Sequence, residues 1–163
     1  MDEWTLLVVL LGSIIISTAF VTILVRHRFG GNIKIFAVFI LGIFAGVGGA
    51  SHGPGEILQG NIAPTGIIIE AWPALTSLWG QPAMTLIPSF SISGILTIIT
   101  GVAVTIWTAS YILSKNGALV LILLSTIMLF VGGGLIPPAL GVVAGIISLR
   151  RSQKDLKNSR QNL

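Results

Sequence analysis

The 163-residue chain contains no cysteine. Without thiols it can form no disulfide, no thiol-based catalytic centre, no iron–sulfur site and no Cys-type zinc site. Charge is also scarce, because Asp, Glu, Lys and Arg make up 9% of the sequence, whereas an ordinary soluble domain carries about 25%. The composition therefore excludes a separate soluble domain and leaves room for one compact helical bundle.

Hydrophobic residues make up 53% of the chain, and most of them lie in long, nearly uncharged stretches. The stretches are Trp4–Val25, Ile35–Ser51, Met84–Leu113 and Ala118–Leu149. About 17 or more such residues match the thickness of a bilayer core. The sequence therefore predicts an all-α, polytopic helix bundle of the cell membrane, with residues 1–149 as one transmembrane domain in contact with the lipid bilayer.

All nine Lys and Arg residues flank these stretches. They are Arg26, Arg28, Lys34, Lys115, Arg150, Arg151, Lys154, Lys157 and Arg160. Basic flanks favour the cytoplasmic side, and no basic stripe with interleaved aromatics indicates nucleic-acid binding. Four crossings cannot place all nine on one side, whereas a fifth crossing can. We expect an external amino terminus with a retained first helix, an external segment at 52–82, and a loosely ordered cytoplasmic tail at 150–163.

The fourth stretch contains a break at Gly132–Pro138 that could supply the fifth crossing. Its members are Gly132, Gly133, Gly134, Pro137 and Pro138, because glycine destabilises a helix and proline lacks a backbone donor. Each half of the stretch is short, since 14 helical residues cover only about 21 Å. The sequence predicts two short crossings or a re-entrant hairpin, and one long kinked helix is the alternative.

Small residues recur at a spacing of four in the apolar stretches. The candidate helix-packing residues are Gly42, Gly46, Thr97, Gly101, Thr105, Gly141 and Gly145. This spacing places each set on one helix face, and close backbone approach is what holds membrane helices together. The faces are expected to close the chain's own bundle, or one of them docks a second protein or copy.

The segment at 52–82 carries the side chains with most chemical potential. His52 and Glu56 flank Gly53-Pro54-Gly55, which predicts a turn that brings them together to share a proton or bind a metal. Glu70 would be the third member, within an interfacial cap at 66–79. The spacing matches no zinc motif, so no metal is predicted and no cofactor is identified. A polar loop at the membrane surface is the alternative.

Three functions follow from these patterns. The first is a non-catalytic small subunit or homo-oligomeric component of a membrane complex, because the spans lack charge and carry many small-residue faces. The second is a channel or transporter for a small solute, lined by the Gly132–Pro138 break. The third is a membrane-surface enzyme that uses His52, Glu56 and Glu70.

Overall fold

The computed structural model describes residues 23, 27, 29–69 and 82–161. The predicted first helix and most of the predicted interfacial cap, Glu70 included, therefore lie outside the described residues. The chain divides into two compact units, residues 1–37 and 38–163.

Within the described residues the chain forms four α-helices and one pair of short strands. The elements are α2 (Ile33–Leu58), β1 (Ile68–Ile69), β2 (Ala83–Met84), α4 (Phe90–Tyr111), α5 (Gly117–Phe130) and α6 (Ile136–Gln161). Among the helices described, α2 and α4 are long and apolar enough to cross a membrane, by length and composition. α5, with 14 residues, is a shorter apolar helix. The all-α class is confirmed, and the antiparallel β1–β2 pair is an addition to it.

In the first unit, a tight turn leads into α2. Gly30 and Gly31 have φ angles of 57° and 77°, a region that glycine enters without steric cost. The side chain of Asn32 then caps the helix, because its Oδ1 accepts hydrogen bonds from the backbone N–H groups of Lys34 (3.1 Å) and Ile35 (3.2 Å). The start of α2 is thus fixed locally by the turn and by the Asn32 cap.

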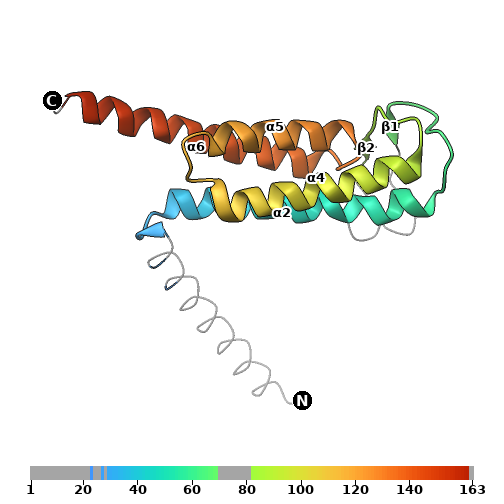
Figure 1. The fold of residues 1–163 in the computed structure, drawn as a ribbon, viewed down its shortest axis with the longest axis horizontal. Helices are drawn as coiled ribbons and strands as arrows, with labels where there is room; N and C mark the ends of the chain where they lie inside the picture. Colours follow the sequence, from blue (N-terminus) through green and yellow to red (C-terminus); the bar gives the residue numbers. More distant parts are fainter. Residues whose placement is uncertain (1–22, 24–26, 28, 70–81, 162–163) are drawn as a thin grey trace, which may run out of the picture. The chain divides into compact units, whose positions relative to one another are not determined.

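In the second unit, α2 and α4 pack against each other in opposite directions (Figure 1). Near one end of the pair Gly42 lies against Thr108, and near the other end Gly53 lies against Gly94. A Cβ atom added at Gly53 would stand 2.5 Å from the Gly94 carbonyl oxygen, so only glycine permits this approach. The contact is therefore between backbones, as expected where small residues let helices come close.

α5 and α6 form a second antiparallel pair, joined by the turn at 131–135 (Figure 1). Gly141 lies against Ser125 early in α6, and Gly145 lies against Ile122 one turn later. The later residue of α6 therefore contacts the earlier residue of α5, so the two helices are antiparallel. The single long kinked helix considered from sequence is thus not formed.

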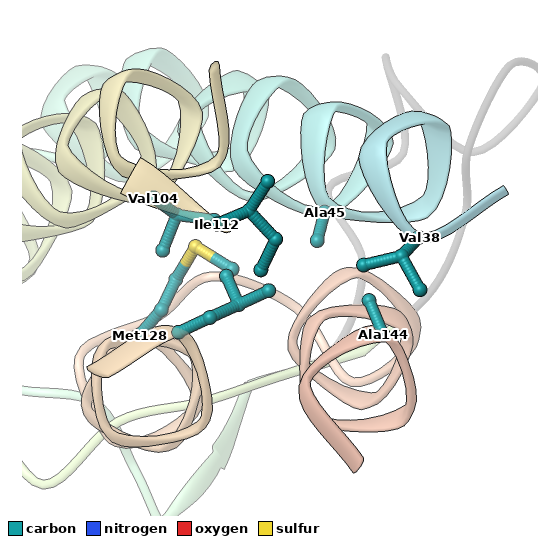
Figure 2. Close-up of a cluster of buried hydrophobic side chains, with 7 residues drawn as sticks. Val38, Ala45, Val104, Ile112, Met128 and Ala144 are labelled. Carbon is teal, nitrogen blue, oxygen red and sulfur yellow. The ribbon is translucent and has the colours of Figure 1, made fainter. Parts of the chain in front are cut away.

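The bundle interior is built from modest apolar side chains (Figure 2). The buried cluster consists of Val38, Ala45, Val104, Ile112, Leu121, Met128 and Ala144. Hydroxyl side chains are buried as deeply, namely Ser93, Thr97, Thr108 and Ser125, each 0% exposed. Large aliphatic side chains lie on the outside, as with Ile99 at 57% exposed and Leu123 at 59% exposed. The interior is therefore small and partly polar, whereas the surface is bulky and apolar.

The turn predicted at Gly53–Gly55 was wrong, because Pro54 lies inside α2. In apolar surroundings backbone groups have few partners outside their own helix, and membrane-type helices tolerate an internal proline. Gly53 serves the close approach to α4 and not a change of direction. As a consequence, His52 and Glu56 are both helical and lie one turn apart on the same face.

The tail also differs from expectation. Residues 150–161, for which we expected loose order, continue α6 without interruption. They follow directly from the packed part of the helix, so helix propagation needs no new nucleation. The basic residues of this segment are thus carried on a helix.

Candidate functional site

Polar side chains gather at the end of the bundle where α2 ends and α4 begins. We call this group the Glu56 site. It comprises His52 and Glu56 of α2, Ser93 and Thr97 of α4, and the turn Val131–Gly134 between α5 and α6. Three segments far apart in the sequence therefore supply the site.

The turn has a shape that depends on glycine. Gly132 and Gly134 have φ angles of 117° and 76°, which side-chain-bearing residues rarely adopt. The N–H of Gly133 donates to the Met128 carbonyl (2.9 Å), and the N–H of Gly134 donates to the Gly132 carbonyl (2.8 Å). The backbone is thus folded tightly back over the end of α5.

The two prolines of the predicted break lie outside the turn. Pro137 and Pro138 occupy the second and third positions of α6, which begins at Ile136. The first N–H groups of a helix have no partner within it, so proline loses nothing there. The prolines therefore begin a helix, while the glycines make the reversal.

Two hydroxyls of α4 hold the turn in place. Ser93 and Thr97 both donate to the carbonyl oxygen of Val131, at 2.7 and 2.6 Å. The Oγ atoms of Thr85 and Ser93 are 2.8 Å apart. Since the single hydroxyl hydrogen of Ser93 is used on Val131, Thr85 is the donor in that bond. The network ties α4, the turn and the residue after β2 together.

Glu56 lies beneath this turn and is only 4% exposed. Neither carboxylate oxygen has a hydrogen-bond partner in the part of the chain that the structure describes. The Ser93 hydroxyl is close enough to interact with the carboxylate, but its hydrogen bond runs to the Val131 carbonyl oxygen, 2.7 Å away. A Cβ atom at Gly132 would collide with the carboxylate, so the glycine backbone seals it directly. A buried polar group without a partner is rare in proteins, and it marks this position for explanation.

His52 lies one helical turn before Glu56 and is half-buried. A Cβ atom at Gly134 would stand 2.5 Å from its Nε2 atom, so the imidazole packs on the same turn. His52 and Glu56 therefore both pack against the Val131–Gly134 turn. Within the described residues no group of three or more His, Cys, Asp or Glu side chains could hold a metal ion. Glu70, the third predicted member, lies outside the described residues.

The predicted packing residues face other helices of the same chain. The contacts pair Gly42 with Thr108, Gly46 with Thr105, Gly101 with Ala50, Gly141 with Ser125, and Gly145 with Ile122. Thr97 differs, because its hydroxyl binds the turn carbonyl. These faces are occupied inside the bundle, so a further protein would have to meet the outer surface.

Sequence reasoning missed the burial of Glu56 and the part played by Thr85. A signal for the first does exist. Gly46, Gly49, Gly53 and Glu56 follow one another at spacings of three or four, which is one face of a helix. Extending the small-residue row past His52 would have placed Glu56 on the packed face. Thr85 lies outside the helices, just after β2, so no helical periodicity in the sequence predicts its contact with Ser93.

The site can hold a proton or a hydrogen-bond donor, and it offers one carboxyl group beside one imidazole. No protein-family model, no curated protein and no solved structure matches this chain.

Proposed function

We propose that this chain is a multi-pass integral membrane protein. The observation that carries the proposal is the distribution of side chains between the interior and the surface. Ser, Thr and Gly share the interior with a small apolar cluster, while most of the large Ile, Leu, Val and Phe side chains in the described residues lie on the outside. Contiguous apolar surface on this scale is unfavourable in water, whereas in lipid it carries no penalty, and helices then associate through small residues.

The proposed orientation places the basic ends in the cytoplasm and the Glu56 site toward the outside. Support comes from the second unit, in which Gly145 lies against Ala118. Lys115 and Arg150, each a few residues further on, therefore share one end of the bundle. The Glu56 site lies at the other end, which carries no described basic residue, in keeping with the positive-inside rule.

Within the membrane, the chain acts as a non-catalytic component that associates with a second copy or another membrane protein. The outer face of α4 suits such a contact. Its exposed aliphatic residues are Ile92, Ile95, Ile99, Val102 and Ile106. They follow at spacings of three and four, which is the pattern of a helix–helix seam. We assign the association to this α4 ridge, because the small-residue faces are already used inside the bundle.

The test is the native mass of the chain, extracted gently from its own membrane. We expect a homo-oligomer or a complex with a partner at fixed stoichiometry. Ile99→Trp should reduce this assembly, since a bulky ring in the α4 ridge prevents close approach. Leu123→Trp is the matched control, because Leu123 is equally exposed but lies on α5. A folded chain that is monomeric and free of partners would contradict the proposal.

A channel or transporter for a small solute is the second candidate, and one observation favours it. A carboxyl group without a partner lies directly under irregular backbone, and ionisable groups inside membrane bundles commonly mark solute or proton pathways. Solute flux into liposomes tests this function. Flux that is the same for the native chain and for folded Glu56→Gln and Gly133→Leu variants would exclude it.

A further inference from the structure

The packing around Glu56 decides which ligand its carboxylate can take. Gly132 lies so close that an added Cβ atom would collide with Oε1, and the turn is pinned above it by Ser93 and Thr97. A metal cation would need several oxygen ligands at about 2.3–2.6 Å and space for itself. A proton needs no cavity. The geometry therefore favours a proton over a cation.

Of the described hydroxyls near the carboxylate, Ser93 is the one that can favour a negative charge on it, but its hydrogen bond runs to the Val131 carbonyl oxygen. Ser93 and Thr97 each have one hydroxyl hydrogen, and both hydrogens point to the Val131 carbonyl. Thr85 directs its hydrogen to Ser93. Unless Ser93 turned away from the Val131 carbonyl, an ionised carboxylate would thus be buried without a donor, an arrangement that is strongly unfavourable. The neutral acid fits this environment, whereas the anion does not.

The groups that face Glu56 leave one titratable neighbour among the described residues. α4 presents Ser93, whose hydroxyl is itself bonded to Thr85, and the turn presents the backbone of Gly132. None of these titrates in the ordinary range. On α2 itself His52 lies one turn away, packed on Gly134. No described cation compensates a charge at Glu56.

We propose that Glu56 is a proton-binding switch whose neutral form lets the Val131–Gly134 turn close over it. When the O–H bond of the carboxyl group breaks, the proton passes to water and a negative charge remains on the carboxylate. The charge requires water or donors, so the turn lifts to admit them. This inference goes beyond membrane association, and it stands whether the chain is a monomer or part of a complex.

The test uses the full chain in detergent or lipid, with the hydrophobic reagent dicyclohexylcarbodiimide as probe. This reagent adds to protonated carboxyl groups that lie in apolar surroundings. We expect mass spectrometry to find the adduct on Glu56, with a yield that falls several-fold as pH rises and is unchanged by added Na⁺ or Ca²⁺ at fixed pH. Protection by a cation at fixed pH would overturn the proposal in favour of a cation site.

A second measurement follows the turn itself. Hydrogen exchange at residues 131–135, corrected for the intrinsic effect of pH, should speed up with rising pH in the native chain. In Glu56→Gln, which is neutral at every pH, the corrected exchange should remain slow throughout. If the variant does not fold, the native pH series together with the labelling yields decides. No adduct on Glu56, or exchange that is indifferent to pH in the native chain, would overturn the proposal.

Discussion

At the scale of single residues, Gly132 is required both for its backbone conformation and for the space that its missing side chain leaves, and mutations can separate the two effects. Its φ angle is 117°, and a Cβ atom added there would collide with the Glu56 carboxylate. Gly132→Ala should therefore lose about 1–3 kcal/mol of unfolding free energy from backbone strain, and more from the collision. Denaturant unfolding in mild detergent measures the loss.

Gly60→Ala is the matched control for this substitution. Gly60 has a φ angle of 85°, but nothing lies within 4 Å of an added Cβ atom. It should show the strain of roughly 1–2 kcal/mol alone. Equal losses in the two variants would mean that the contact between Gly132 and Glu56 contributes nothing.

Thr97 and Thr100 form a second pair at this scale. The Thr97 hydroxyl crosses to the Val131 carbonyl at 2.6 Å, whereas the Thr100 hydroxyl bonds to Leu96 in its own helix at 2.8 Å. Thr97→Val should cost about 1 kcal/mol of unfolding free energy, and Thr100→Val less than about 0.5 kcal/mol. The same unfolding experiment compares them, and the reverse order would show that the turn is not held by Thr97.

At the scale of helices, the contact between α2 and α4 depends on the absence of side chains. A Cβ atom at Gly46 would stand 2.6 Å from the backbone nitrogen of Thr105 and 2.7 Å from the carbonyl oxygen of Gly101. Backbone atoms cannot rotate away as a side chain can. Gly46→Leu should therefore cost 3 kcal/mol or more, above the usual range of about 1–3 kcal/mol for overpacking.

Val47→Leu controls for the added bulk at the next position of α2. Val47 is 57% exposed, so there is room for the larger side chain among the described residues. We expect its melting temperature in mild detergent to match the native chain. A similar fall in both variants would indicate that α2 and α4 do not pack as described.

Helix positions were predictable where a long apolar stretch was bounded or interrupted by glycines, and less so elsewhere. The stretch Met84–Leu113 contains α4, and the Gly132–Gly134 reversal separates α5 from α6. Observed helix ends differ from the predicted ends where a local sequence preference competes with packing between helices. Pro54 suggested a turn, but the packing of Gly53 on α4 retained the helix through Leu58. Ser89 caps α4, because its Oγ accepts a hydrogen bond from the Ile92 N–H at 3.4 Å. The pattern of apolar stretches did not predict this cap.

The candidate site was predictable only in part, for a related reason. His52 and Glu56 were singled out because charge is rare in this chain, and the three glycines because they interrupt a helix. Their meeting was not foreseen, since it depends on α2 continuing as a helix where a loop was expected and on the Val131–Gly134 turn packing against it. Contacts between segments about 76 residues apart leave no local trace in the sequence.

At the scale of the whole molecule, the lack of cysteine makes orientation directly measurable. Single cysteines can be introduced without removing native ones. Asn61→Cys and Lys115→Cys both place a thiol at an exposed position, beyond opposite ends of α4. In intact cells an impermeant maleimide should label position 61, and position 115 only after permeabilisation. The opposite result would invert the proposed topology.

Because α6 continues through Gln161, one uninterrupted helix joins the turn over Glu56 to the basic tail. With 26 residues the helix is about 39 Å long, and its first turn is joined to the turn over Glu56. A stiff rod magnifies rotation with distance from its pivot, so a tilt of roughly 5° at the first turn displaces the far end by roughly 3 Å. That far end carries Lys154, Lys157 and Arg160. In the orientation proposed above, release of the Glu56 proton on one side of the membrane would move positive charge on the other side.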